Sequence, residues 1–286
     1  MLKIRHIAKP KNVSGQAKTT KHRDNHKEKF MPIEIKEITS LSDFIQKTTE
    51  LGTERKIWFR GLPDVDYDLK PSIFRAPFNP DLEKDFNTQF QSRAIPFLKT
   101  IPRDPWEWQF VMQHFGVPTR LLDWTVSGLA ALAFAIIFRE DKSDRDKHFG
   151  KDAGIWCLDP IKLNSLARIG LAEPEKIPDI SKEQQIKTLY DFNSKVPTYP
   201  VAITGPLNNE RIVAQKGVFT LFPNSAPYQN LTEKEKSDEF LIKFIIRNEF
   251  VVPIRKELGR MGMSESTLFP DLSHLALELK RDLTEA

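Results

Sequence analysis

The order of helical and strand patterns along the chain restricts its fold more than any other feature. Hydrophobic residues recur mostly at helical spacing between residues 41 and 138, whereas short β-rich runs separated by Gly, Pro and Asn fill the last third. A doubly wound parallel sheet would require strands and helices to alternate regularly. The sequence therefore predicts a single α+β domain, with helices packed on a small mixed or antiparallel sheet.

Local patterns give approximate bounds for these elements. Strands are expected at 56–59, 153–158, 201–204, 211–214, 218–222 and 240–246. Helices are expected at 41–51, 80–98, 105–115, 129–138, 160–168, 253–260 and 271–283. Residues 181–194 are polar and helix-prone, which favours a surface arm.

The longest apolar run, residues 129–138, has the sequence LAALAFAIIF and stops at Arg139. A membrane span needs about 20 apolar residues, so this run does not predict one. Ser127 precedes it in the position of a helix N-cap, and Ala and Leu are strong helix formers. We therefore expect a buried core helix here and no membrane partner.

Basic residues are concentrated at the N-terminus. In residues 1–30, nine Lys and Arg against two acidic residues give a formal charge of +7, which leaves −3 for the rest of the chain. Residues 1–31 lack a sustained apolar period and are predicted to form a disordered basic arm before a folded domain over 32–286. Whether the residues before Met31 belong to the native protein stays open at this point.

Composition narrows the class of protein further. Hydrophobic residues make up 40% of the chain and charged residues 29%, a balance typical of globular domains. Cys157 is the single cysteine, so no internal disulfide can form, and we expect a reducing compartment, by default the cytoplasm. The sequence lacks the phosphate-binding loop GxxxxGK, the dinucleotide-binding motif GxGxxG, the serine-hydrolase motif GxSxG and the zinc-protease motif HExxH. No metal site is predicted.

Four dense segments combine apolar residues with charged or amide side chains that an ordinary core would avoid. They are WFRG at 58–61, QHFGVPTRLLDWT at 113–125, RIVAQKGVF at 211–219 and STLFPD at 266–271. In these segments and their order, the chain resembles the FRG-domain family from about residue 38 to residue 279. The resemblance implies a protein of bacteria, archaea or phages, with some members in defence or toxin contexts, and it implies no firm activity.

Arg60 is a candidate catalytic residue because it follows a predicted strand and precedes a flexible glycine. Its guanidinium can fork onto a phosphate or carboxylate, and Gly61 would allow close backbone approach to a ligand. The alternative is a buried structural ion pair, for instance between Arg60 and Asp123. Both interpretations remain open from the sequence.

The middle segment supplies further candidates around a turn fixed by proline. Thr119 and Arg120 can converge on an anion, although Arg120 can instead pair with Asp123. Gln113 and His114 end the preceding predicted helix. His114 can act as an acid or base near neutral pH, or simply pack against its neighbours.

Gln215 is predicted at a strand-to-strand junction, where its amide can bind a base or nicotinamide edge or satisfy backbone groups in the turn. Asp271 is predicted to cap the last helix. The candidate catalytic residues are Arg60, His114 and Gln215. The candidate ligand-binding residues are Gln113, Thr119, Arg120, Asp123 and Gly61.

Two classes of function fit these candidates. The order Arg, Thr and Gln-x-Gly looks like the three-part layout of ADP-ribosyltransferases, with NAD as cofactor, Arg60 on the pyrophosphate, and Thr119 and Arg120 near the nicotinamide ribose. The expected Glu is replaced by Gln215 or displaced to Glu210. The alternative is a non-catalytic recognition module for a nucleotide, nucleic acid or phage component. The slightly acidic domain argues against a broad footprint on duplex DNA.

Overall fold

A computed structural model of the chain describes residues 32–285 without 53, 99, 140–146, 169, 171–174, 195–198, 207–209 and 225–228. The predicted basic arm over 1–31 lies outside this described part. Within it, eleven α-helices accompany one mixed sheet of seven strands, so the predicted α+β class is confirmed. No described helix is long and apolar enough to cross a membrane.

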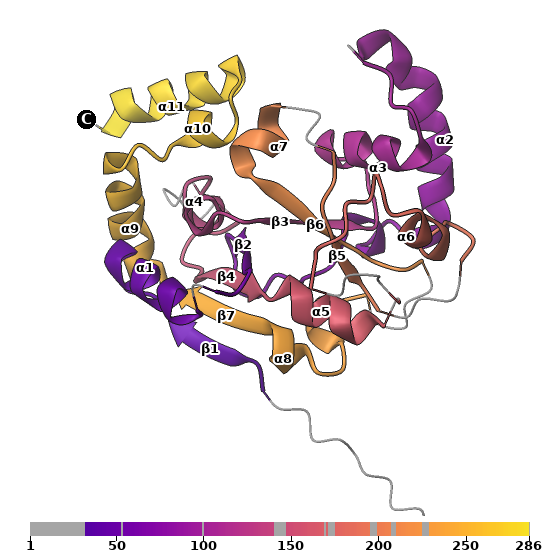
Figure 1. Cartoon of the computed structure of the whole chain (residues 1–286). Helices are drawn as coiled ribbons and strands as arrows, with labels where there is room; N and C mark the ends of the chain where they lie inside the picture. Colours follow the sequence, from indigo (N-terminus) through magenta and orange to yellow (C-terminus); the bar gives the residue numbers. More distant parts are fainter. Residues whose placement is uncertain are drawn as a thin grey trace, which may run out of the picture.

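The sheet has the strand order β1-β7-β4-β2-β3-β6-β5. The β1 and β7 strands are parallel, and every other neighbouring pair is antiparallel. The strands are β1 (Glu34–Glu37), β2 (Trp58–Leu62), β3 (Leu121–Thr125), β4 (Ala153–Leu158), β5 (Val201–Ile203), β6 (Gly217–Leu221) and β7 (Leu241–Ile246). Strands distant in sequence thus become neighbours in the centre of the molecule (Figure 1).

The helices vary from single turns to about four turns. They are α1 (Leu41–Glu50), α2 (Glu83–Ala94), α3 (Pro105–His114), α4 (Gly128–Ile136), α5 (Pro160–Ala167), α6 (Gln184–Leu189), α7 (Glu210–Gln215), α8 (Ser237–Phe240), α9 (Asn248–Arg260), α10 (Glu265–Leu268) and α11 (Leu272–Glu285). Short 3-10 helices lie at Ser72–Phe74, Pro80–Leu82, Ile95–Phe97 and Leu231–Glu233.

One face of the sheet is covered by α1, α4 and α9. The predicted central helix is confirmed, because Ser127 Oγ accepts a hydrogen bond from the Ala130 amide and α4 follows. Most of the Ala and Leu side chains of α4 are fully buried. They pack on Phe59 of β2 and Phe244 of β7, which places the main core between α4 and the central strands.

The opposite face is built on Trp58, Trp156 and other alternate residues of the central strands, with α5 packed near β5. A third cluster lies where α3 and α6 cover β3, β5 and β6. There Phe110 of α3 meets Phe219 of β6 edge to face, with ring centroids 4.9 Å apart. The α4 helix contacts β2, β4 and β3, whereas the α3 helix packs on β3 and β6, so the two helices meet the sheet at neighbouring places.

Several predicted elements are confirmed, including β4 at 153–158 and α3 within one residue of its predicted end. The predicted strand at 211–214 is wrong, because these residues belong to the helix α7. The strands β1 and β3 were not predicted. The prediction of a surface arm at 181–194 is wrong in part. Ile186 and Tyr190 of this segment are buried in the third cluster.

Candidate functional site

A pocket of about 210 Å³ opens where β2 and β3 separate. These two strands share a single residue pair, Phe59 with Thr125, whereas β2 pairs with β4 along its whole length. Side chains from β2, β3, β6, α3, α4 and α7 line the pocket. In Figure 1, α3 and α7 are drawn above β3 and β6, and α4 is drawn beside β3.

Arg60 lies at the divergence of the two strands. Its Nη1 donates a hydrogen bond to the Asp123 carbonyl oxygen over 2.6 Å, and Asp123 Oδ2 is 4.0 Å from the same nitrogen. Its Nε is buried and has no hydrogen-bond partner in the described part of the chain. Burial lowers the pKa of Arg60 to about 10, an effect that Asp123 opposes and the positive charge of Arg75 reinforces. The positive charge of the Arg60 guanidinium is therefore only weakly balanced by negative charge around it.

Asp123 contributes a carboxylate to the pocket, and its side chain is 55% exposed. Gln113 Nε2 donates a hydrogen bond to Asp123 Oδ2 over 2.7 Å. The hydroxyl of Thr119 donates in turn to Gln113 Oε1. Thr119 is fully buried and does not line the pocket, so its effect on the site passes through Gln113. This chain of hydrogen bonds fixes the orientation of the Asp123 carboxylate.

The α7 helix contributes Arg211 and Gln215 to the wall of the pocket. The backbone carbonyl of Gln215 accepts a hydrogen bond from the Thr125 hydroxyl over 2.6 Å, which ties α7 to β3. Gln215 Nε2 donates to the Leu268 carbonyl oxygen over 3.1 Å. The prediction that Gln215 occupies a strand-to-strand junction is wrong, because it ends a helix immediately before β6.

Arg211 is a site residue that the sequence did not single out. It lines the pocket, and burial lowers its pKa while the negative charges of Asp123 and Asp271 oppose that shift. A strand at 211–214, as predicted, does not indicate that Arg211 lines the same pocket as Arg60. The signal that was available is its helical spacing of four residues from Gln215.

His114 ends α3 as predicted and lines the same pocket. Burial and the positive charge of Arg211 lower its pKa from the usual 6.5. The neutral imidazole is therefore the dominant form at neutral pH. In that state His114 can donate or accept a hydrogen bond without adding charge to the pocket.

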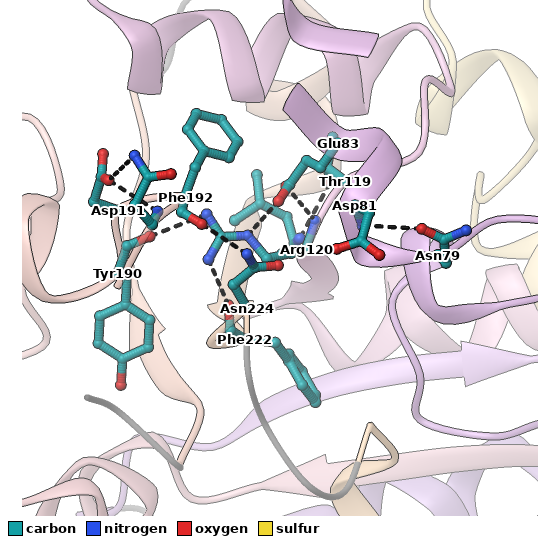
Figure 2. A network of polar contacts seen from close by, with 12 residues as sticks. Asn79, Asp81, Glu83, Thr119, Arg120, Tyr190, Asp191, Phe192, Phe222 and Asn224 are labelled. Atoms are coloured by element: carbon teal, nitrogen blue, oxygen red, sulfur yellow. Dashed lines mark hydrogen bonds and ion pairs between the residues drawn. The ribbon is translucent and has the colours of Figure 1, made fainter. Parts of the chain in front are cut away.

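Arg120 does not contribute to the pocket, which corrects its assignment as a ligand-binding residue. It is 1% exposed, and its Nε lies 2.5 Å from Glu83 Oε2. Figure 2 shows its guanidinium enclosed by Glu83 and the backbone carbonyl groups of Tyr190 and Phe222. The proposed pairing with Asp123 is replaced by a buried ion pair with α2, so Arg120 is a structural residue.

Gly61 lines the pocket, and its lack of a side chain is needed by α4. A Cβ at this position would lie 1.8 Å from the Ala131 carbonyl oxygen and 2.8 Å from the Ala135 nitrogen. The close approach that Gly61 allows is thus between a strand and a helix. The side chain of Glu210, the displaced carboxylate considered from the sequence, lies outside the described residues.

The last motif segment also reaches this region. Asp271 caps α11 as predicted, since its Oδ1 accepts a hydrogen bond from the His274 amide over 2.9 Å. In the described part of the chain, no group of three or more His, Cys, Asp or Glu side chains is arranged to hold a metal ion. The structure brings together Arg60, Gly61, Gln113, His114, Asp123 and Gln215, and adds Arg211.

Comparison with known protein families finds a domain match over part of the chain. Residues 55–145 match the FRG domain, so the chain contains an FRG domain over β2, α2, α3, β3 and α4. No curated protein and no solved structure matches the chain. Arg211, Gln215 and the segment around Asp271 lie outside the matched residues, although they border the same pocket or contact its wall.

Proposed function

We propose that this FRG-domain protein binds a small anionic ligand of the nucleotide class in the pocket between β2, β3, α3 and α7. The observation that carries the proposal is that two arginines from different elements, Arg60 of β2 and Arg211 of α7, line one pocket, where Asp123 is the one carboxylate among the described lining residues. Desolvation lowers the pKa of both guanidinium groups. A buried, poorly compensated cation is costly, and a bound phosphate would offset that cost.

The remaining lining suits the rest of a nucleotide. Phe59, Phe110, Trp124, Phe134 and Phe219 give the pocket an aromatic character, and Gln113 and Gln215 supply amide groups near the charges. Ligand pockets combine apolar walls with a few placed polar groups, typically in about 300–1,000 Å³. At about 210 Å³, this pocket fits a phosphate with part of a sugar or ring, so the rest of a dinucleotide would extend beyond it.

A second candidate, NAD-dependent ADP-ribosyl transfer at the same site, is favoured by the place of Asp123. A transferase of this kind needs a carboxylate near the anchored pyrophosphate, and Asp123 shares the pocket with Arg60 and Gln215. In that reaction the bond from ribose C1′ to nicotinamide breaks with its electron pair on nicotinamide. The acceptor then bonds to C1′ and releases its proton. Asp123 would stabilise the oxocarbenium-like centre between these events.

Binding is tested by isothermal titration of the full chain with AMP, ADP, NAD and pyrophosphate. Arg60→Met should weaken the binding of a phosphate-containing probe at least tenfold, which is about 1.4 kcal/mol. Arg93→Met is the matched control, because Arg93 is an exposed arginine of α2 that does not line the pocket. Absence of binding for all four probes, or equal effects of both variants, would overturn the proposal.

Catalysis is tested separately from binding. The wild type incubated with NAD and cell lysate should release nicotinamide and add ADP-ribose to an acceptor, and Asp123→Asn should remove this activity. Asp123→Asn should at the same time bind ADP more tightly, because a negative charge leaves an anion site. Unchanged NAD together with ADP binding would leave the recognition module, without catalysis, as the function of the site.

A further inference from the structure

The guanidinium of Arg211 lies over the ring of Phe269, with Cζ 4.2 Å from the ring centroid. The same ring stacks on His274, with centroids 4.3 Å apart and planes inclined by 11°. Phe269 comes directly after α10, outside the matched FRG residues. A pocket cation is therefore in contact with the C-terminal part of the chain.

Phe269 is itself held firmly. Phe134 and Phe138 contact its ring edge to face, at interplanar angles of 86° and 87°. Its amide donates to the Glu265 carbonyl oxygen over 2.8 Å, and its own carbonyl accepts from the Asp271 amide over 2.8 Å. The ring is only 9% exposed. A ring fixed on its edges and its backbone offers Arg211 a rigid surface.

The same segment also contacts Gln215, the other polar side chain that α7 contributes to the described pocket lining. Gln215 Nε2 donates to the carbonyl oxygen of Leu268, the residue before Phe269. Arg211 and Gln215 are four residues apart and thus lie on one face of the α7 helix. The segment from the end of α10 to the start of α11 consequently contacts both polar side chains, Arg211 and Gln215, that α7 contributes to the described pocket lining.

We propose that Phe269 is a positioning residue for ligand binding, which holds the Arg211 guanidinium at the pocket through a cation–π contact. The inference rests on the proposed function, since it concerns how the second cation of that site is placed. A guanidinium stacked on one plane keeps its N–H donors at the edge, where they can meet a phosphate. Fixing a long, flexible side chain before binding removes part of the entropic cost of ordering it.

The test compares ADP and pyrophosphate binding by the wild type, Phe269→Leu and Phe269→Tyr. Phe269→Leu should weaken binding about three- to tenfold, and Phe269→Tyr should retain affinity because it keeps the ring. Leu272→Ala is the matched control, since Leu272 is 84% exposed in the same segment. The loss in Phe269→Leu should vanish when Arg211→Ala is already present, because the contact then has no cation.

A second readout does not depend on any ligand. In the wild type, the Nε–H resonance of Arg211 should be shifted upfield by the Phe269 ring current, as assigned by its loss in Arg211→Lys. The shift should persist in Phe269→Tyr and disappear in Phe269→Leu. If the wild type binds no probe but this shift behaves as stated, the proposed function fails and the positioning of Arg211 stands. Full binding by Phe269→Leu, or an Arg211 resonance insensitive to it, would overturn the inference.

Discussion

Arg60 takes the place of a strand partner for Asp123. Its guanidinium donates to the Asp123 carbonyl oxygen over 2.6 Å, beyond the single residue pair that joins β2 to β3. A backbone carbonyl at a separating strand needs a donor, and here the donor is a charged side chain. The separation of β2 from β3 opens the pocket, and it also leaves the Asp123 carbonyl free to hold the Arg60 guanidinium at the pocket.

Arg60→Met should reduce ligand binding while leaving the free energy of unfolding nearly unchanged. The variant loses one hydrogen bond, which costs about 1 kcal/mol. It also removes a largely buried charge whose nearest carboxylate oxygen is 4.0 Å away, and this loss of a desolvation cost acts in the opposite direction. Urea denaturation checks the balance. A destabilisation of about 3 kcal/mol or more would instead identify Arg60 as a structural residue.

Arg120→Met should lower the free energy of unfolding and leave ligand binding nearly unchanged, which is the reverse of the result expected for Arg60→Met. It leaves the carboxylate of Glu83 buried without its cation, which costs about 3–5 kcal/mol of stability. Lys182→Met is the control, because Lys182 forms an exposed pair with Asp179 and its removal should cost about 1 kcal/mol or less. Urea denaturation measures both effects. Recovery of stability when Glu83→Leu is added to Arg120→Met would show that the lone buried charge causes the loss.

Sequence patterns predicted the parts of the site that depend on local structure. Asp271 caps α11 as the residues around it indicate. Arg60 was predicted to follow a strand at 56–59, and that position is wrong because Arg60 lies inside β2 (Trp58–Leu62). Arg120 shows the limit of such reasoning. Its partner Glu83 is the first residue of α2, 37 residues earlier in the chain, and no local sequence spacing connects the two. A buried ion pair of this kind arises only when tertiary packing brings the start of α2 next to Arg120, the residue before β3.

The α7 helix was missed for a related reason. The run Arg211–Ala214 contains Ile and Val, whose β-branched side chains favour strands. In the fold, Ile212 packs in the cluster with Phe219, and the chain turns through Lys216 at φ 49° before β6 begins. Tertiary packing therefore overrides a weak local preference, and the second pocket arginine is missed along with the helix.

The pKa of His114 should rise when an anion binds. In the free protein, burial and the positive charge of Arg211 lower the pKa of His114 from 6.5. A phosphate bound near Arg211 would offset that positive charge and favour the imidazolium. Proton NMR titration of the His114 ring, with and without pyrophosphate, measures the shift. His148, which lies outside the pocket, is the internal control. An unchanged pKa for His114 would place the bound anion elsewhere.

The same lowered pKa also predicts a small acid dependence of stability. Because the folded-state pKa of His114 lies below the unfolded value, the unfolded chain binds protons first as the pH falls. His114 therefore favours the folded state fully above about pH 6.5, and its contribution is lost as the pH falls through the lowered folded value. Urea denaturation of the wild type and His114→Gln at pH 7.5 and 5.5 measures the contribution of His114 to the free energy of unfolding at each pH. A wild-type stability that falls no further than that of His114→Gln would contradict the assignment.

Gly61→Ala should destabilise the protein severely, by about 3 kcal/mol or more. The new Cβ would lie 1.8 Å from the Ala131 carbonyl oxygen, and that obstacle is helix backbone, which cannot rotate away as a side chain would. Gly259→Ala is the matched control, because a Cβ at Gly259 in α9 would meet nothing within 4 Å. This control should be stabilised by about 0.5–1 kcal/mol through lower chain entropy in the unfolded state. Urea denaturation of both variants compares the two costs. If Gly61→Ala instead unfolded like the wild type but lost ADP binding, the glycine would serve the ligand and not the contact between β2 and α4.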